Sequence, residues 1–276
     1  MNQLYKNIGI SKQAIAQYKK RQDLFDDSIM HLMLDVQELR EEHPGCGLEK
    51  IYFTLNPDFI GRDRFIDYFS ELGFKIRKKI NYKRTTYSIP SNFPNLIKGI
   101  TIKSPSIVWQ TDITYFEVGD KFYYGVFIID VYNKVIVGYQ TSDNMRATAN
   151  IKAIKMAFKK HTPPKIHHSD RGSQYTCKEY IKILEDNNCK ISMAQSAQDN
   201  AYAERINNTI KNEYLNYWKQ TTFEQLKTQV DKAVFNYNNK RIHNNLNRET
   251  PIIFNAKWQT IKSYKNKKMI IFNNEN

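Results

Sequence analysis

Three consecutive strand-forming segments near the middle of the chain constrain its fold more than any other feature of the sequence. They are SIVWQTDITYFEV (106–118), KFYYGVFIIDV (121–131) and VIVGYQTS (135–142). Each is rich in the β-branched and aromatic residues that favour strands, and the turn-forming pairs Gly119-Asp120 and Asn133-Lys134 separate them. Such segments, joined by such short turns, predict a three-stranded antiparallel meander.

Helix-like and strand-like segments alternate after the meander. We expect helices at about 147–160, 176–187, 199–217 and 223–238, and short strands at 165–169 and 189–193. A meander followed by alternating helices and strands predicts an α/β fold, in which helices flank a mixed five-stranded sheet. This succession of elements is similar to that of the ribonuclease-H-like fold.

The N-terminal region, residues 1–74, has a different pattern. Apolar residues from Phe25 to Leu39 recur at intervals of four and three, which predicts an amphipathic helix over 24–41. Two shorter helices are expected at 47–55 and 61–74. Three short helices with polar and basic edges resemble a helix-turn-helix DNA-binding unit, and any small helical bundle fits the pattern equally well.

Positive charge dominates the segment that follows these helices. No acidic residue occurs from Leu72 to Thr111. We predict that residues 75–104 form a basic linker able to follow a DNA backbone, that residues 105–255 form the α/β domain, and that residues 256–276 form a basic tail. The linker residues expected to contact DNA are Lys78, Lys79, Lys83 and Arg84.

The overall composition agrees with a nucleic-acid partner. Lys and Arg number 42 against 28 Asp and Glu, which gives a formal net charge of +14. Such an excess favours binding to a polyanion, and a merely basic soluble protein is the alternative. No stretch approaches the roughly 18 apolar residues of a membrane span, no signal peptide is apparent, and the three cysteines are scattered. We therefore expect a cytoplasmic protein.

Three carboxylates fall where the predicted fold can bring them together. Asp112 lies in the middle of the first strand, Asp170 just past the fourth strand, and Glu204 about one turn into the helix that begins near residue 199. The fourth strand pairs beside the first in this fold, so the three can converge. Each acid alone is compatible with an ordinary surface role. Together they suit two Mg²⁺ or Mn²⁺ ions that promote phosphodiester displacement.

Four ordered motifs resemble those of bacterial insertion-sequence transposases of the second-reading-frame (OrfB) type. They are WQTDITY, HSDRGSQYT, DNAYAERINNTIKNEY and NKRIHNNLNRETP, and REEHPGCGLEKIYFTL resembles the upstream helix-turn-helix segment of the family. The similarity extends from about Leu39 to about Pro251. It implies a retroviral-integrase-like catalytic core with an Asp-Asp-Glu triad, and four motifs in order are far more specific than any one of them.

The resemblance assigns roles to particular residues. It implies that Asp112, Asp170 and Glu204 are the triad and hold two Mg²⁺ ions. It also implies that Lys211, seven residues after Glu204, contacts the DNA at the ends of the element. The other residues that match the motifs and are expected near the site or the DNA are Gln174, Tyr175, Asn200, Arg241 and His243.

The resemblance also implies partners. They are double-stranded DNA, both as element ends and as target, further copies of the chain on that DNA, and an upstream-frame helix-turn-helix partner or fusion. The expected location is the nucleoid in the bacterial cytoplasm. Two departures bear on activity: 33 residues separate Asp170 from Glu204, two fewer than is usual in the family, and Ile242 stands where the family usually has proline.

The histidines do not form the zinc site of retroviral integrases. That site needs two His and two Cys, and the N-terminal region offers only His31, His43 and Cys46. His167 and His168 alternate across a strand, so only one of them can face the acids. His168 shares the parity of Asp170, and we expect it to be an ordinary buried histidine or a supporting group.

The sequence thus predicts a DNA transposase, a polynucleotidyl transferase that cleaves and transfers strands at the ends of an insertion sequence. A catalytically decayed or domesticated transposase that acts as a DNA-binding regulator is the alternative, and the intact triad argues against it. A nuclease of the ribonuclease H type that acts on RNA–DNA hybrids fits the core. It does not fit the N-terminal helices, the basic linker or the C-terminal motif.

Overall fold

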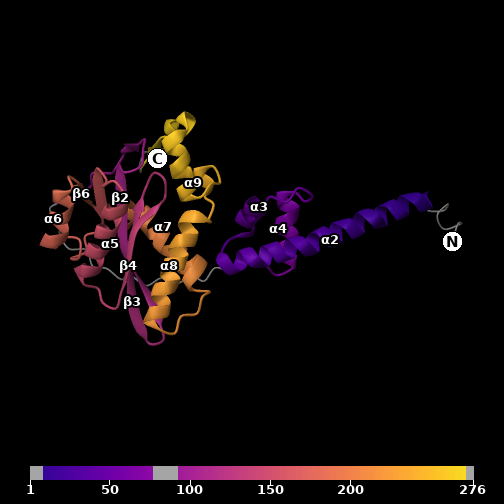
Figure 1. Ribbon diagram of the computed structural model, residues 1–276, viewed down its shortest axis with the longest axis horizontal. Helices are drawn as coiled ribbons and strands as arrows, with labels where there is room; N and C mark the ends of the chain where they lie inside the picture. The colour runs from indigo at the N-terminus through magenta and orange to yellow at the C-terminus, as the bar shows by residue number, and fades with distance from the viewer. Residues whose placement is uncertain (1–8, 77–92, 272–276) are drawn as a thin grey trace. The chain divides into compact units, whose positions relative to one another are not determined.

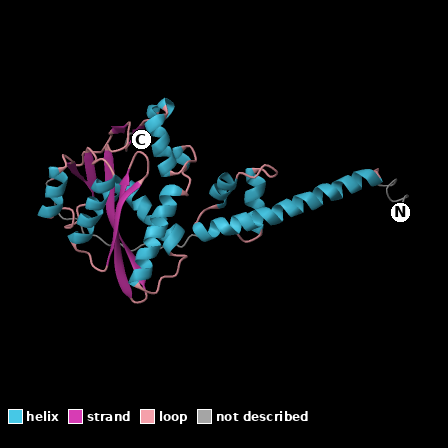
Figure 2. Ribbon diagram, in the orientation of Figure 1, coloured by secondary structure: helices cyan, strands magenta, loops and turns pink. Residues whose placement is uncertain are grey.

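The computed structural model describes residues 9–76 and 93–271 of the chain. The chain divides into two compact units, Met1–Arg77 and Lys78–Asn276 (Figure 1). The first unit is helical and the second contains the β-sheet (Figure 2). No helix among the described residues is both long and apolar enough to cross a membrane.

The N-terminal unit consists of α2 (Lys12–Glu42), α3 (Leu48–Leu55) and α4 (Arg62–Glu71). The apolar face predicted for α2 packs against the other two helices, where Phe65 and Phe69 stack with ring centroids 4.4 Å apart. The helix begins twelve residues earlier than predicted, because the Ser11 side chain caps it by accepting a hydrogen bond from the Ala14 N–H. Residues 12–22 contain no glycine or proline to stop the helix.

The second unit is built on a five-stranded sheet whose order is β4-β3-β2-β5-β6. β2 (Val108–Val118), β3 (Lys121–Asp130) and β4 (Ile136–Ser142) form the predicted antiparallel meander. β5 (Ile166–Ser169) pairs in parallel with β2, and β6 (Lys190–Met193) pairs in parallel with β5. The predicted mixed sheet is confirmed, with the fourth strand beside the first.

Helices cover both faces of this sheet (Figure 1). α5 (Ala147–Lys160) and α6 (Lys178–Asp186) pack on one face against Val126 and Ile128 of β3. α7 (Ala201–Thr209) and α8 (Phe223–Asn239) pack on the other face against Phe127 and Ile129. This division follows from the alternation of side chains along a strand. A π-helical segment, Ile210–Leu215, continues α7.

The segments at both ends of the α/β domain differ from their predicted roles. β1 (Thr101–Ile102) pairs with β7 (Met269–Ile270), and α9 (Pro251–Thr260) packs beside them. Ile97, Ile102 and Ile271 are fully or almost fully buried in this cluster. Residues 93–104 and the tail as far as 271 therefore pack into the second unit, because apolar residues stand between the basic ones. Linker residues 77–92 lie outside the described part of the chain.

Candidate active site

Asp112 lies on β2 with its side chain toward α7. The preceding residues on the strand hold the start of that helix in place. Gln110 Oε1 accepts hydrogen bonds from the backbone N–H groups of Tyr202 (3.0 Å) and Ala203 (3.4 Å). Asn200 Nδ2 donates to the Thr111 carbonyl at 2.9 Å. The first turn of α7, which carries Glu204, is thereby fixed against the strand that carries Asp112.

Asp170 follows β5 directly, and the parallel pairing of β5 with β2 places it on the same side of the domain as Asp112. Its Oδ1 accepts a hydrogen bond from the Gly172 N–H at 3.0 Å. A Cβ at position 172 would lie 2.9 Å from Gln174 Oε1 and 3.0 Å from Asp170 Oδ1. Glycine at 172 therefore lets the loop close tightly around this carboxylate.

Asp170 and Glu204 act electrostatically on Asp112. Burial raises the pKa of Asp112 well above its usual range, and the negative charges of Asp170 and Glu204 raise it further. Hydrogen bonds from the Ile113 N–H (2.9 Å) and Asn207 Nδ2 (2.9 Å) oppose this shift. Burial also raises the pKa of Asp170, and a smaller degree of burial raises that of Glu204, whose side chain is otherwise exposed. A cation among these oxygens would relieve the repulsion.

The three carboxylates are not arranged closely enough to coordinate a metal ion together. Within residues 9–76 and 93–271, no three His, Cys, Asp or Glu side chains are grouped closely enough to hold a metal ion. Glu204 is exposed on the first turn of α7, whereas Asp112 and Asp170 are partly buried. The donor chemistry fits Mg²⁺ or Mn²⁺, which prefer carboxylate and carbonyl oxygens. The arrangement is therefore suited to a divalent cation but is open on the side of Glu204.

Asn207 is a residue of this site that the sequence analysis did not identify. It lies one turn after Glu204 on α7, and its Nδ2 donates to Asp112 Oδ2 at 2.9 Å. Its Oδ1 is buried and has no hydrogen-bond partner in the structure. The signal in the sequence was the spacing of three residues from Glu204, which puts both side chains on one face of the helix.

Three other predicted site residues make internal contacts. Gln174 Nε2 donates to the Met145 carbonyl at 2.9 Å. Tyr175 is buried in the core beneath α5 and α6, with its hydroxyl 3.3 Å from Thr111 Oγ1, and burial raises its pKa well above the usual range. Asn200 is buried against β2, as described above. Gln174 and Tyr175 thus lie in the loop that follows Asp170, and Asn200 contacts β2 one residue before Asp112.

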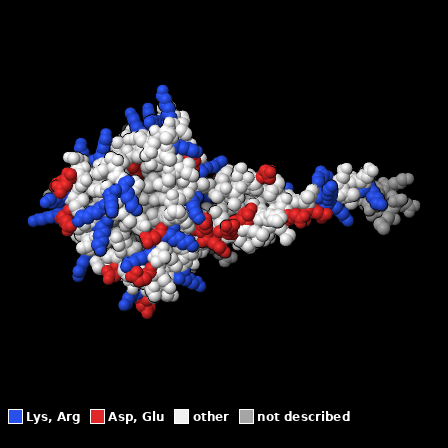
Figure 3. All heavy atoms as spheres, in the orientation of Figure 1, with Lys and Arg blue, Asp and Glu red and all other residues white. Residues whose placement is uncertain are grey.

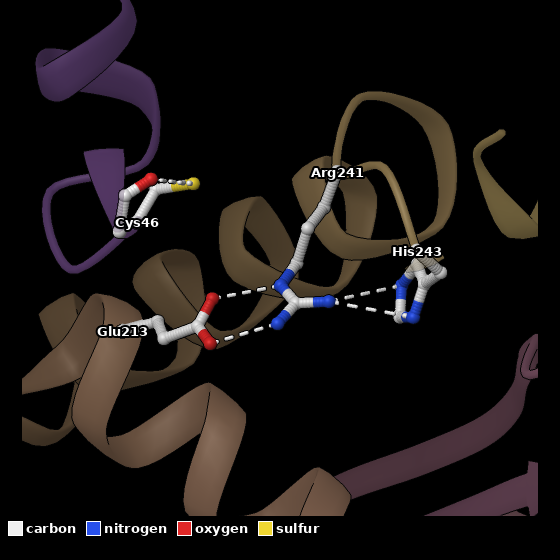
Figure 4. Close-up of polar contacts among 5 residues, drawn as sticks. Cys46, Glu213, Arg241 and His243 are labelled. Atoms are coloured by element: carbon white, nitrogen blue, oxygen red, sulfur yellow. Dashed lines mark hydrogen bonds and ion pairs between the residues drawn. The ribbon is translucent and has the colours of Figure 1, made fainter. Parts of the chain in front are cut away.

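Lys211 and Arg241 lie further along the same side of the domain. The Lys211 ammonium is 3.9 Å from the centre of the Tyr115 ring, and burial lowers its pKa. Arg241 is only 8% exposed and forms a bidentate ion pair with Glu213, in which both N–O distances are 2.7 Å (Figure 4). Its third nitrogen lies 3.2 Å from His243 Nε2. Arg241 thus ties the π-helical segment to the end of α8.

The two adjacent histidines connect β5 to its neighbouring elements by hydrogen bonds. His167 Nε2 is 2.7 Å from the Tyr180 hydroxyl of α6, and His168 Nδ1 is 2.8 Å from Ser192 Oγ of β6. Burial lowers the pKa of His167 to about 3 and that of His168 to about 4. Both are therefore neutral at pH 7 and act as packing groups. The linker residues Lys78, Lys79, Lys83 and Arg84 lie outside the described part of the chain.

Comparison with protein families agrees with the fold of the second unit. Residues 103–198 match one model of the integrase core domain, and residues 186–251 match a second integrase core model. Among solved structures, the chain is similar to one in the simian T-cell lymphotropic virus intasome in complex with the PP2A regulatory subunit B56 gamma. The TM-score is 0.50 at 13% identity, over 79% of this chain and 73% of that chain. This similarity concerns the fold alone.

Curated relatives come from bacterial insertion sequences. An uncharacterized 31 kDa protein of insertion element IS600 from Shigella sonnei is 32% identical over 212 residues, which are 74% of this chain and 78% of the relative. A putative transposase, InsK, for insertion sequence element IS150 of Escherichia coli (strain K12) is 29% identical over 176 residues, and the match spans 62% of each chain. The chain belongs to the integrase-core family of bacterial insertion-sequence transposases, as its four motifs predicted.

Proposed function

We propose that the chain cleaves DNA at the ends of an insertion sequence and joins the freed 3′ ends to target DNA, with Asp112, Asp170 and Glu204 as the catalytic residues. The observation that carries the proposal is that β5 and α7 both meet β2 at Asp112: β5, which ends beside Asp170, pairs in parallel with β2, and Asn207, one turn after Glu204, donates to Asp112 Oδ2 at 2.9 Å. The negative charges of Asp170 and Glu204 raise the pKa of Asp112, and a divalent cation bound nearby would offset that repulsion.

Asp112, Asp170 and Glu204 would hold two Mg²⁺ or Mn²⁺ ions, and Asn207 would orient Asp112 from α7. When bound, the ions supply charge stabilisation for the in-line displacement at phosphorus. The fold of the chain positions the three carboxylates. The pairing of β2 with β5 fixes Asp112 and Asp170 relative to each other, and the bonds of Gln110 and Asn200 fix the first turn of α7.

DNA would be bound mainly through charge. The formal net charge of +14 favours contact with phosphates. Lys211 lies seven residues after Glu204, and its ammonium, which stands 3.9 Å from the centre of the Tyr115 ring, can still donate to a phosphate oxygen. We also propose that the linker residues, from Lys78 to Arg84, and the helices of the N-terminal unit contact the element ends. An assembly of several copies on DNA, with or without an upstream-frame partner, completes the proposal.

Replacement of Asp112 tests the proposal. With Mg²⁺ present, Asp112→Asn should reduce cleavage of DNA that contains the element ends by at least on the order of a thousandfold, because it removes a metal-binding charge worth several kcal/mol at the transition state. Binding to the same DNA should be retained. Asp186→Asn, at the exposed end of α6, is the matched control and should cleave normally.

The same assay separates the competing functions. A DNA-binding regulator would bind the ends without strand cleavage in the unaltered chain. A ribonuclease of the hybrid-cleaving type would prefer an RNA–DNA hybrid to the element ends. Cleavage retained by Asp112→Asn would refute the assignment of the triad.

A further inference from the structure

α2 carries a regular row of exposed side chains on the face opposite its buried residues. Its members alternate at intervals of three and four, which is the spacing of a coiled-coil seam. Two of them are large and apolar: Leu24 is 58% exposed and Leu34 is 63% exposed. The row, here called the α2 seam, consists of Gln17, Lys20, Leu24, Asp27, His31, Leu34, Glu38 and Glu41, all exposed.

The α2 seam is complementary to itself when a second copy runs in the opposite direction. If the two helices cross at the level of Ile29, Leu24 of each faces Leu34 of the other. The same register places Lys20 opposite Glu38. It also places Asp27 opposite His31 and Gln17 opposite Glu41. Each pairing occurs twice because the arrangement is two-fold symmetric. Leucine meets leucine, lysine meets glutamate, and Gln17 and His31 each meet a carboxylate to which they can donate a hydrogen bond.

The distribution of charge along α2 favours the same orientation. Residues 12–22 contain four basic residues and no acid, whereas residues 23–42 contain seven acids and one Arg. In Figure 3 the basic side chains of this helix gather toward its N-terminal end and the acidic ones beyond them. A parallel pair would set Lys20 against Lys20 and Glu38 against Glu38, which is repulsive. An antiparallel pair sets the basic part of each helix against the acidic part of the other.

We propose that the α2 seam is a docking surface for a second copy of this chain, which binds as an antiparallel helix pair. The overlap from residue 17 to residue 41 is about 36 Å long at 1.5 Å per residue. Only the two Leu24–Leu34 layers are apolar, so the charged layers set register and direction while the pair remains weak and sensitive to salt. This inference does not depend on the catalytic proposal, since it concerns a face of the N-terminal unit alone.

Disulfide trapping in the full-length chain tests the register. The double variant Gln17→Cys/Glu41→Cys should form a covalent dimer on mild oxidation, because the two positions face each other across the pair. Gln17→Cys alone is the matched control: its two copies lie about 36 Å apart in the antiparallel pair and should remain uncoupled. The unaltered chain controls for Cys46, Cys177 and Cys189. Dimers formed equally by the single variant, or none formed by the double variant, would overturn the proposal.

Charge reversal tests the pairing without a cross-link. Lys20→Glu or Glu38→Lys should each weaken self-association about tenfold at low salt, since each places two like-charged pairs in the seam. The double variant Lys20→Glu/Glu38→Lys should restore it. Lys12→Glu changes the net charge equally but lies outside the overlap, so it should have no such effect. Equal loss of DNA binding with Lys12→Glu and Lys20→Glu, and no rescue by the double variant, would assign the helix to DNA and overturn the proposal.

Discussion

The two halves of the candidate site are held in different ways. The strand half, Asp112 and Asp170, is fixed by a central strand that pairs on both sides and by backbone hydrogen bonds to both carboxylates. The helix half, Glu204 and Lys211, lies on α7 and the π-helical segment after it, and Glu204 is exposed. Under the proposed function, Asp112 and Asp170 are preorganised before metal or DNA binds, and Glu204 and Lys211 take up their final positions on binding.

The largest expected effect concerns the anchor of the helix half. Arg241→Leu should destabilise the chain by about 3–5 kcal/mol, because the Glu213 carboxylate would lose its partner while it stays largely out of water. Urea unfolding measured by circular dichroism gives the change in the free energy of unfolding. Glu213→Gln/Arg241→Leu removes both charges and should recover most of the loss. A cost below about 1 kcal/mol for the single variant would mean that this ion pair does not anchor the segment.

Strand β5, which ends beside Asp170, should instead be the element that acid weakens, through its two buried histidines. His167 has a pKa of about 3 in the folded chain and about 6.5 when unfolded, so the unfolded state binds more protons between these values. Stability is therefore complete above about pH 6.5 and falls as the pH drops toward 3. Between pH 7 and pH 4.5 the loss should be on the order of 2–3 kcal/mol for this residue. His168 adds a loss in the same direction.

His167→Gln isolates this contribution. Glutamine does not titrate and can still reach the Tyr180 hydroxyl, so the variant should lose less stability on acidification than the unaltered chain. Urea midpoints at pH 7 and pH 4.5 provide the comparison. His161→Gln is a control from the surface end of α5, where the imidazole is more accessible. The same acid sensitivity in His167→Gln as in the unaltered chain would contradict the prediction.

The parts that could be predicted from the sequence are those set by local pattern. The strand pattern predicted that Asp112 lies within β2, and the order of elements placed β5 beside β2. Which helix covers the Asp112 face was learned from the structure. The Arg241–Glu213 pair could not be predicted, because it joins residues 28 positions apart across a π-helical segment that has no marker in the sequence. The excess of basic residues also led residues 93–104 to be predicted as linker. Three isoleucines in that stretch pack into the domain instead.

Asn207 connects the two halves, and its replacement should lower activity without unfolding the chain. Asn207→Ala removes the donor to Asp112 Oδ2, and loss of such a supporting hydrogen bond should reduce metal-dependent cleavage about 10- to 100-fold. The concentration of Mg²⁺ needed for half-maximal cleavage should rise at the same time. Asn208→Ala, which alters the exposed neighbour on the same helix, should change neither value. Equal losses in both variants would point to a general effect on α7.

The smallest expected effect compares the two halves directly, without metal. Asp112→Asn should raise the melting temperature by a few degrees at pH 7, because it removes a partly buried charge that Asp170 and Glu204 repel. Glu204→Gln should leave it almost unchanged, since that side chain is exposed. Because the pKa of Asp112 is raised in the folded chain, folding is penalised only at pH values where the unfolded chain carries the ionised carboxylate. The gain from Asp112→Asn should therefore disappear as the pH falls below about 4. Equal shifts in both variants at pH 7 would show that the strand half and the helix half carry their charges in the same environment.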